Sequence, residues 1–580
     1  IFKLKIMKKI LLLLQLFISQ QLFAQKWQTI FEQSAGKQTV TYEECIRYYS
    51  ALDAAFATIH IKQFGLTDAG YPLHLVLFSN DGTHDPTIWH KKNKLVIMIN
   101  NGIHPGEPDG IDASMMFLRD LATGKIKAPD NVVLGIIPVY NIGGSLNRTA
   151  FSRVNQNGPE SYGFRGNAQN LDLNRDFIKN DSRNAKEFAK IFHYLNPDIL
   201  VDNHVSDGAD YQHTMTLLTS QHNKLGPIMG AYLHDIFEPS LYKGMEQKNW
   251  NLIPYVSFEG GNPERNWTAF YDAPRYSSGY AALFQTMAFM PETHMLKPYD
   301  QRVKSTYDLM QTFIEEGSKQ ATAIKTTRKK AIDAVKQQQE FPQTYRVDTT
   351  RFDQIRFMGY TSAQKISEVT GMNRMYYDRS KPYTKEIKYY NYLKGEQFVN
   401  KPKAYIIPQG WHEVIERLSI NKVAMQRLKK DTVIEVEVSR ITDYRTATRS
   451  FEKHYRQSGI RVSQQTENIR FLKGDYVIYT GQAADRFLIE TLETGTDDSY
   501  FSWNFFDAIL QQKEGYSNYR WEDVAATYLQ EHPELRAELD AKKKTDEKFA
   551  ASANAQLDFV YKKSPYYEPA HMRYPVFRLK

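Results

Sequence analysis

Cysteine is almost absent from this chain: its 580 residues contain one, Cys45. A single cysteine excludes an intrachain disulfide and also a thiolate-rich metal site. Any metal bound here must therefore be held by histidine and carboxylate side chains.

Blocks of like charge and long apolar runs are also missing. The net charge of +8 is spread thinly over the sequence, with no basic block of the kind that marks a nucleic-acid partner. Beyond the N-terminal region no apolar run approaches the roughly 20 residues that a membrane-spanning helix needs. We therefore expect no nucleic-acid partner and no membrane span. The oligomeric state stays open.

The N-terminal region has the pattern of an export signal. "MKKILLLLQLFISQQLFAQ" begins at Met7, with two lysines, an apolar stretch and a small residue, Ala24, before Gln25. This order is typical of a secretory signal peptide, and the apolar stretch is too short to span a bilayer. We predict a signal peptide over 1–24, in which 1–6 is an upstream extension, and an exported protein that is periplasmic or extracellular. An uncleaved anchor is the alternative.

Strand and helix patterns alternate from residue 38 to residue 330. The strands are apolar on both faces, as in a sheet covered by helices on both sides. This predicts an α/β fold with a mixed central sheet flanked by helices. The predicted strands are 73–79, 94–100, 131–141 and 198–206, the predicted helices are 41–56, 109–124 and 181–197, and 279–295 is a helix running into a strand.

The second part of the chain has a different pattern. A charged helical stretch, 303–340, ends near Pro342, and a single core rarely exceeds about 250–300 residues. Beyond it the sequence is β-rich, and a charged helical tail closes it. We therefore predict a catalytic α/β domain over 38–330 and a β-rich accessory domain with a helical tail over 342–580. Two small domains in the second part are the alternative. The β-rich segments are 403–411, 431–441 and 473–481, and the tail is 521–562.

Two metal-capable side chains follow a strand that is predicted to be buried. In "INNGIHPGEPDG" (99–110), His104 and Glu107 come after the apolar run of 94–100, and His204 ends the strand of 198–206. Ligands of open α/β sheets bind at the carboxyl ends of strands. Two histidines and one glutamate leave a fourth position for water, which is the arrangement of a catalytic zinc. This predicts one Zn²⁺ per chain, and the alternative is a chance pair in a solvated turn.

Four motifs occur in an order that resembles a known family. HPGE (104–107), LDLNRDF (171–177), DNH (202–204) and PETHM (291–295) are arranged as in zinc carboxypeptidases of the carboxypeptidase A type, over about residues 38 to 320. The resemblance implies a carboxypeptidase-like fold, of the phosphorylase/hydrolase type, and a peptide substrate with a free C-terminal carboxylate.

The resemblance also implies a role for individual residues. His104, Glu107 and His204 match the zinc ligands, and Glu292 matches the general base and acid. Asn174 and Arg175 match the pair that binds the terminal carboxylate of the substrate, and a guanidinium fork suits a carboxylate.

Other positions are less fixed by the pattern. Arg153 lies where the family has an arginine that stabilises an oxyanion, with Arg148 as its competitor. Asp202 or Asn203 is expected to orient a metal ligand. The family also uses a tyrosine that closes over the substrate, and the sequence does not choose among Tyr271, Tyr276 and Tyr280. His213, His222 and His294 are not expected to be ligands.

The leading functional hypothesis is a secreted zinc metallocarboxypeptidase that hydrolyses C-terminal peptide bonds by attack of activated water. The first alternative is a zinc amidohydrolase of the same fold acting on peptidoglycan peptides or N-acyl amino acids. The second is an inactive binding protein on a peptidase scaffold. Separately, the C-terminal part could bind a carbohydrate or a partner through an aromatic platform, although aromatic residues are more often part of a core. The candidates for that platform are Trp411, Trp503, Phe505 and Phe506.

Overall fold

A computed structural model describes residues 27–256 and 263–580. The predicted signal peptide, 1–24, lies outside the described residues. The chain divides into two compact units. One comprises the chain up to Lys401 together with Ile415–Ala424 and Thr480–Ser499, and the other comprises Pro402–Val414, Met425–Tyr479 and Tyr500–Lys580. The sequence boundary at 330–342 therefore falls inside the first unit, and the extent of an independently folding catalytic domain stays a prediction.

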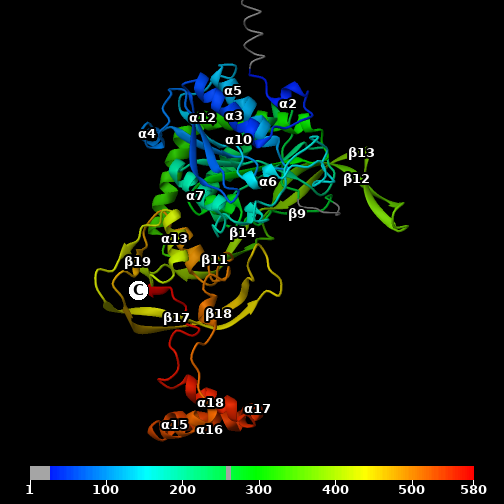
Figure 1. Cartoon of the computed structure of the whole chain (residues 1–580). Helices are drawn as coiled ribbons and strands as arrows, with labels where there is room; N and C mark the ends of the chain where they lie inside the picture. The colour runs from blue at the N-terminus through cyan, green and yellow to red at the C-terminus, as the bar shows by residue number, and fades with distance from the viewer. Residues whose placement is uncertain (1–26, 257–262) are drawn as a thin grey trace, which may run out of the picture. The chain divides into compact units, whose positions relative to one another are not determined.

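The first unit is built on a mixed nine-stranded sheet (Figure 1). Its central strands β4, β3, β5 and β10 run parallel to one another, while β1, β2 and β7 pair in antiparallel fashion. The α/β fold with a mixed central sheet is thus confirmed. In spatial order the strands are β1 (Ile59–Leu66), β2 (Pro72–Phe78), β4 (Val132–Ile137), β3 (Leu95–Asn100), β5 (Ile199–Asp202), β10 (Met287–His294), β7 (Met215–Thr219) and β8 (Ile253–Pro254), with β6 (His204–Ser206) pairing β10.

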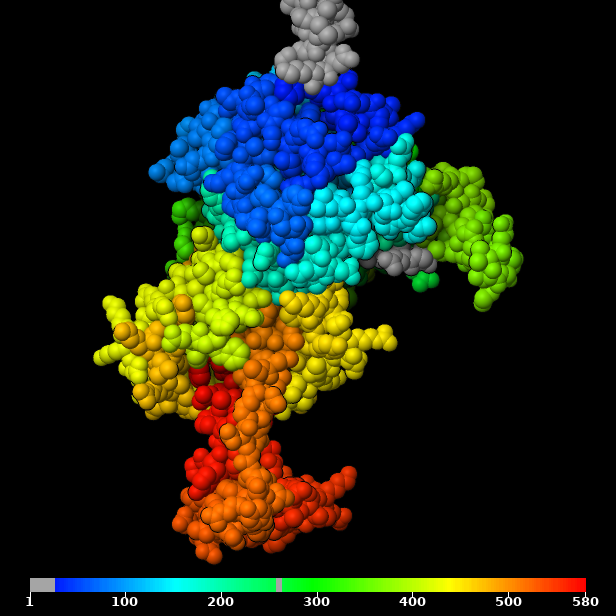
Figure 2. All heavy atoms as spheres, viewed as in Figure 1, coloured from blue at the N-terminus to red at the C-terminus, as the bar shows by residue number. Residues whose placement is uncertain are grey.

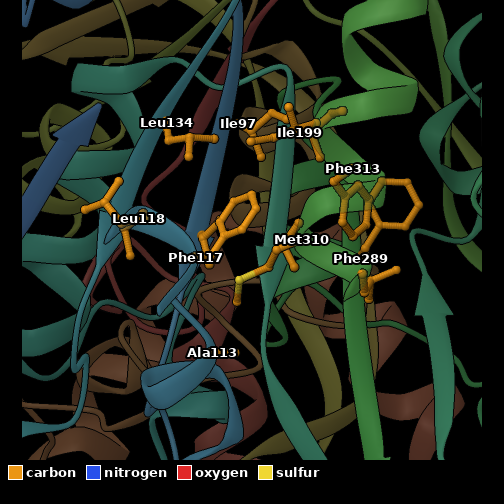
Figure 3. Packing of buried hydrophobic residues seen from close by; sticks show 14 of the residues in the cluster. Ile97, Ala113, Phe117, Leu118, Leu134, Ile199, Phe289, Met310 and Phe313 are labelled. Carbon is orange, nitrogen blue, oxygen red and sulfur yellow. The ribbon is translucent and has the colours of Figure 1, made fainter. Parts of the chain in front are cut away.

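Helices cover both faces of this sheet. Alternate residues of a strand point to opposite faces, and on one face Ile97, Leu134 and Phe289 pack against Phe117 and Phe313 of two helices, α5 and α12 (Figure 3). On the opposite face, a side chain at Gly135 would overlap Leu195 of α7. The sheet is therefore buried on both sides, which explains why β3 and β4 consist of buried residues throughout.

Some helices of this unit begin at a residue whose side chain caps the helix. Thr41 and Glu44 form a capping box at the start of α3, and the Ser182 hydroxyl accepts a hydrogen bond at the start of α7. The α-helices that lie wholly in this unit are α2 (Ile30–Gln33), α3 (Tyr42–Ala55), α4 (Pro86–Lys91), α5 (Asp109–Ala122), α6 (Ile142–Leu146), α7 (Arg183–Leu195), α8 (His222–Leu225), α9 (Met229–Tyr232), α10 (Glu238–Glu246), α11 (Ser277–Ala282), α12 (Tyr299–Gln337) and α14 (Asp485–Leu492).

Residues 340–400 form two antiparallel strand pairs, one nested within the other in sequence, that were not predicted as individual strands. One pairs β11 (Glu340–Val347) with β14 (Leu393–Asn400). The other pairs β12 (Asp353–Ile366) with β13 (Asn373–Tyr390), and it is joined by β9 (Trp267–Thr268). The β12–β13 hairpin stands out from the surface (Figure 2). Its side chains are mostly exposed or half-buried on both faces, so the sequence carries little of the period-two contrast that reveals a strand.

The second unit contains a six-stranded sheet and a helical bundle, as the β-rich and helical patterns predicted. The bundle has its own small core around Trp521, Leu535 and Val560. Trp503 and Phe506 are fully buried, which favours a core role over an exposed platform. The strands are β16 (Gln426–Arg427), β19 (Tyr476–Tyr479), β15 (Ala404–Ile407), β20 (Phe577–Leu579), β17 (Thr432–Thr446) and β18 (Gln457–Phe471), and the helices are α15 (Asn518–Glu531), α16 (Pro533–Thr545), α17 (Glu547–Ala550) and α18 (Ala553–Lys562), with α13 (His412–Ile420) bridging the two units in sequence.

Among the described residues, no helix combines the length and the apolar composition needed to cross a bilayer.

Candidate functional site

The ends of two neighbouring strands, β3 and β5, are held together by polar side chains. The Asn100 amide donates to Asp202 Oδ1 over 2.8 Å, and the Asn203 amide donates to Asn101 Oδ1 over 2.8 Å. All four residues are buried. These bonds fix the positions at which the chain leaves the sheet, and the segments that carry His104 and His204 start from there.

Two glycines allow the backbone to pass closely at this edge. A side chain at Gly106 would lie 2.6 Å from Arg153 Cδ and 3.1 Å from the carbonyl oxygen of Gly163, and one at Gly110 would overlap Asn203. Because only glycine fits such close approaches, the turn of HPGE can bring His104 and Glu107 to one point, and the start of α5 can pack against the end of β5.

His104, Glu107 and His204 converge as the sequence predicted. One ligand-capable atom from each lies within 4.8 Å of the others, and all three residues are buried. The carboxylate of Glu107 lies between the two imidazoles, with Oε1 at 3.1 Å from His104 Nδ1 and Oε2 at 3.1 Å from His204 Nδ1. Two imidazole nitrogens and a carboxylate oxygen facing one point are a donor set that suits Zn²⁺.

The outer nitrogen of each imidazole faces a carboxylate. His104 Nε2 lies 2.9 Å from Asp172 Oδ1, and His204 Nε2 lies 3.4 Å from Asp202 Oδ2. Histidines that bind a metal usually donate their other N–H to such a group, which fixes the tautomer and orients the ring. The residues present therefore fit a zinc ion. Asp202 occupies the orienting position that was expected of Asp202 or Asn203, and Asp172 does the same for His104, which the sequence analysis missed.

The electrostatics of the cluster favour a cation. Burial acts to raise the pKa of Glu107, but His104 and Arg153 outweigh it and hold this pKa well below its usual range. Burial acts to lower the pKa of His204, but Asp202 and Glu107 outweigh it and raise this pKa well above its usual range. The raised pKa of His204 shows that negative charge surrounds the cluster, and such surroundings stabilise a divalent cation once the imidazole has lost its proton.

Glu292 lies beside this cluster on β10. It is the register partner of His204 in the parallel pair of β10 and β6, and its side chain lines the same cavity. Burial raises the pKa of Glu292 to about 8, while His204 opposes this shift and Glu107 adds to it. A carboxyl group with such a pKa can both accept and return a proton near neutral pH.

Asn174 and Arg175 line the cavity from a short 3₁₀ helix, Leu173–Arg175. The Arg175 guanidinium donates to the carbonyl oxygen of Asn174 over 2.7 Å, and its Cζ lies 4.7 Å from the ring centroid of Tyr276. The aromatic face thus supports the arginine by a cation–π contact. Its remaining N–H groups suit a carboxylate entering from the cavity.

Arg148 and Arg153, the two candidates for the oxyanion role, differ in what they contact. Arg148 donates to backbone carbonyls of Thr39, Val40 and Ser161, so it holds chain segments together and is not among the residues that line the cavity. The Arg153 guanidinium, 18% exposed, donates to Glu107 Oε1 over 2.8 Å.

Arg165 is a cavity residue that the sequence analysis missed. Its side chain is 45% exposed and lies 3.1 Å from Asp172 and 3.5 Å from Glu107. Burial acts to lower the pKa of Arg165, but Glu107 and Asp172 outweigh it and raise the pKa, and Glu292 adds to this effect. Arg165 precedes Asp172 by seven residues in the motif-bearing stretch, which was the available signal.

The cavity has a volume of about 320 Å³. An apolar side is formed by residues that include Leu218, Tyr255, Phe270 and Met290. Of the three tyrosines that were left open, Tyr276 lines the cavity. Tyr271 bonds to Asp497 and the Tyr280 hydroxyl donates to Asn421 over 2.6 Å. Tyr276 is therefore placed to touch a substrate, and Tyr255 joins it as a residue that was not predicted.

A late segment of the chain supports the loop that carries Tyr276. The backbone N–H of Arg275 donates to Asp498 Oδ2 over 2.9 Å, and the Arg275 guanidinium lies 2.9 Å from Asp498 Oδ1. Asp498 is fully buried. Thr480–Ser499 belongs to the same compact unit as the sheet, so residues beyond 342 contribute directly to the surroundings of the cavity.

The three histidines that were not expected to be ligands do not line the cavity. His213 Nδ1 lies 2.8 Å from the Asn251 carbonyl oxygen. The ring centroid of His222 lies 4.4 Å from that of His234, with the two rings tilted. Burial lowers the pKa of His294 to about 3.

The chain is similar in sequence to known carboxypeptidases. Carboxypeptidase 2 of Trichophyton equinum is 22% identical over 449 residues, which cover 71% of this chain and 74% of the relative. The solved structure of the carboxypeptidase A from Helicoverpa armigera aligns over 49% of this chain and 75% of its own, with 15% identity and a TM-score of 0.37. A metallo-carboxypeptidase from Burkholderia cenocepacia aligns over 48% and 69%, with 15% identity and a TM-score of 0.36. The family model described as zinc carboxypeptidase matches residues 46–460. The chain therefore belongs to the zinc carboxypeptidase family and is a metallocarboxypeptidase, a peptide hydrolase.

Proposed function

We propose that this protein is an exported, zinc-dependent carboxypeptidase that releases the C-terminal residue of a peptide. The observation that carries the proposal is the convergence, in one cavity, of a histidine–carboxylate cluster, a buried carboxyl group and an arginine with further N–H groups that can bind a carboxylate, besides its contacts with Asn174 and Asp172. The residues are His104, Glu107 and His204 for the metal, Glu292 for proton transfer, and Asn174 and Arg175 for the substrate.

One zinc ion per chain is proposed at His104, Glu107 and His204. When bound, zinc supplies a Lewis acid that makes water more acidic and polarises a carbonyl group. The protein's own contribution is to keep Glu107 ionised and both imidazoles oriented by Asp172 and Asp202. Elemental analysis of the purified protein should give one zinc atom per chain, and a stoichiometry near zero or two would contradict this assignment.

Arg175 and Asn174 hold the terminal carboxylate of the substrate, which places the last peptide bond beside Glu292. Glu292 accepts a proton from the attacking water and returns it to the nitrogen of the leaving residue. Its burial supports both steps, because a carboxyl group with a pKa of about 8 binds the transferred proton readily, and the positive charge of a bound cation brings that pKa back toward neutrality.

An arginine stabilises the negative charge that develops on the carbonyl oxygen. Both Arg153 and Arg165 line the cavity. Arg165 is the more exposed of the two, 45% against 18%, so more of its guanidinium is open to the cavity, and it lies 3.5 Å from Glu107 at the metal cluster. We therefore assign Arg165 the larger share of this role and Arg153 the smaller.

A substrate panel tests the function. Peptides with a free C-terminus, their amides, γ-linked and D-residue peptides, and N-acyl amino acids are incubated with purified protein, with and without a chelator, and the products are read by mass spectrometry. We expect loss of one C-terminal residue from free-acid peptides, abolished by the chelator. Preferential hydrolysis of the γ-linked and D-residue peptides or of the N-acyl amino acids would favour the amidohydrolase alternative instead.

Glu292→Gln separates an enzyme from a binding protein. The substitution removes the proton acceptor without changing the size of the side chain, so turnover should fall by about 10²–10⁴-fold while zinc is retained. Unchanged turnover would exclude Glu292 from the mechanism. No turnover in either protein, with normal peptide binding, would favour the inactive scaffold.

Export and domain organisation are also proposals. Export is supported by the pattern of 1–24, and N-terminal sequencing of the protein from its native host should begin at Gln25. The division into a catalytic part (38–330) and an accessory part (342–580) is supported by the change in sequence pattern. Limited proteolysis should cut near residue 340 if the two parts fold independently.

A further inference from the structure

A second, open cavity adjoins the catalytic one. Its volume is about 660 Å³, and it shares Arg153, Val154 and Gln156 with the catalytic cavity. The carboxylate-binding residues Asn174 and Arg175 are not among the described residues that line it. The second cavity therefore continues the first past the metal cluster, away from the end at which a substrate's C-terminus is held.

Two apolar side chains stand at the border of these cavities. Val154 lines both of them and is 91% exposed, and Phe151 lines the second and is 86% exposed. Single exposed apolar residues are common on protein surfaces. Here two such residues lie together at the rim of a substrate cavity. A ligand that bound there would bury both side chains, so they can form an apolar wall of a binding site.

The backbone beneath these side chains is firmly held. The Tyr162 hydroxyl donates to the carbonyl oxygen of Ala150 over 3.1 Å and accepts from the backbone N–H of Arg153 over 3.3 Å. On the other side of the loop, the buried Arg302 donates to the carbonyl oxygens of Asn157 and Gly158 over 2.9 and 3.1 Å.

Arg302 is fixed in turn by Asp109 at the start of α5, 3.1 Å away. The floor of the second cavity is thus tied to the same helix that packs against the metal-binding segments. A preorganised floor with exposed apolar side chains costs little ordering free energy on binding.

We propose that this second cavity binds the part of the substrate that lies upstream of the cleaved bond, and that Phe151 and Val154 form an apolar wall for its side chains. The inference rests on the proposed carboxypeptidase function. Once Arg175 holds the C-terminal carboxylate and the last peptide bond lies at the metal cluster, the rest of the peptide must leave the catalytic cavity at another point. The opening beside Val154 continues into a space large enough for two or three residues.

The wall predicts a substrate class: peptides of at least four residues with apolar side chains upstream of the scissile bond. Three charged residues also line this cavity: Lys37, Glu160 and Arg153. Lys37 and Glu160 have opposite signs, and Arg153 is paired with Glu107 over 2.8 Å. We therefore expect apolar upstream residues to be preferred over charged residues of either sign.

A length series tests the inference. N-acetylated peptides of two to six residues with the same C-terminal pair are compared by kcat/KM, with leucine or glutamate at the upstream positions. We expect kcat/KM to rise by about tenfold from two to five residues in the leucine series, and to rise much less in the glutamate series. A flat dependence on length would overturn the proposal.

Substitutions of Phe151 and Val154 test whether the rise of kcat/KM with peptide length comes from the apolar wall. Phe151→Ala and Val154→Ala should each lower kcat/KM for the leucine pentapeptide about threefold to tenfold, and kcat/KM for the dipeptide should fall by much less. Val369→Ala is the matched control, because Val369 is also apolar and 94% exposed, lies between β12 and β13, and lines neither cavity. Equal loss on the dipeptide and the pentapeptide would contradict the wall.

The two proposals fail in different ways. Chelator-sensitive hydrolysis of the dipeptide by all variants supports the carboxypeptidase function whatever the length series shows. Absence of hydrolysis for every length would count against the proposed function itself.

Discussion

Arginine 175 offers the sharpest test of substrate recognition, through the substitution Arg175→Ala. Its guanidinium donates one hydrogen bond to the Asn174 carbonyl oxygen over 2.7 Å and packs against the ring of Tyr276. The side chain is 22% exposed, so water competes only partly for the remaining N–H groups. These are available as a fork for a carboxylate.

The magnitude follows from the number of bonds. A hydrogen bond to a charged group contributes about 1.5–3 kcal/mol net, so a fork of two contributes about 3–6 kcal/mol. Partial exposure favours the lower end of that range. At about 1.4 kcal/mol per factor of ten, Arg175→Ala should lower kcat/KM for free-acid peptides roughly 10²–10³-fold.

The assay compares each peptide with its C-terminal amide. An amide has no negative charge for the fork, so the variant should lose less than about tenfold on amides, and the wild type's preference for the free acid should largely disappear. For Arg175→Lys we expect a loss of kcat/KM on free-acid peptides smaller than that of Arg175→Ala, because lysine keeps the positive charge but cannot form two parallel hydrogen bonds to a carboxylate. Arg183→Ala is the control, since Arg183 is an exposed arginine outside the cavity. Equal losses on acid and amide would refute the carboxylate role.

Three further predictions concern residues around the site. Asp172→Asn should weaken zinc binding about 10–100-fold, because the carboxylate that orients His104 is lost, and a competition titration with a chelator measures this; unchanged affinity would exclude the orienting role. Asp498→Asn removes the carboxylate that holds Arg275, so KM for free-acid peptides should rise while kcat changes little; a lower kcat at constant KM would contradict this. Asp112 concerns stability: burial raises its pKa to about 7, above an unfolded value of about 4. The native state then binds the extra proton, so this group's contribution to the free energy of unfolding falls as pH rises from about 4 to 7, by at most about 1.4 kcal/mol per pH unit. Urea unfolding at pH 4 and pH 7 measures the free energy of unfolding of the wild type and of Asp112→Asn. We expect this free energy to depend less on pH in the variant, because the variant lacks the titrating carboxyl group.

Local pattern explains why much of the central fold could be predicted. The apolar runs of β3, β4 and β5 are buried on both faces. A short run of this kind can be recognised from the local sequence alone. The helix expected over 109–124 is observed as Asp109–Ala122, and that over 181–197 as Arg183–Leu195. One of the four helix ends matches the prediction, and the other three differ from it by two residues. In α7 the observed ends are fixed by the Ser182 cap and by Asn196 in the left-handed conformation.

The pairing of distant polar residues was harder to see. Asp172 and Arg165 belong to no apolar or charged pattern, and their importance comes from His104 and Glu107, which lie about 60 residues earlier in the chain. The long strands β12 and β13 were missed for a related reason. Their stability rests on cross-strand pairing over fourteen register positions, and pairing of this kind leaves no signature in either strand alone.

The sequence by itself determined the metal-binding chemistry of this protein. With one cysteine, only histidine and carboxylate ligands were available, and the motifs around residues 104 and 204 supplied the candidates. The tertiary structure decided which tyrosine and which arginines face the cavity, that a second cavity adjoins it, and that residues 480–499 support the loop of Tyr276. These outcomes depend on side chains meeting across the fold, and a meeting across the fold is set by packing, which no local stretch of sequence encodes.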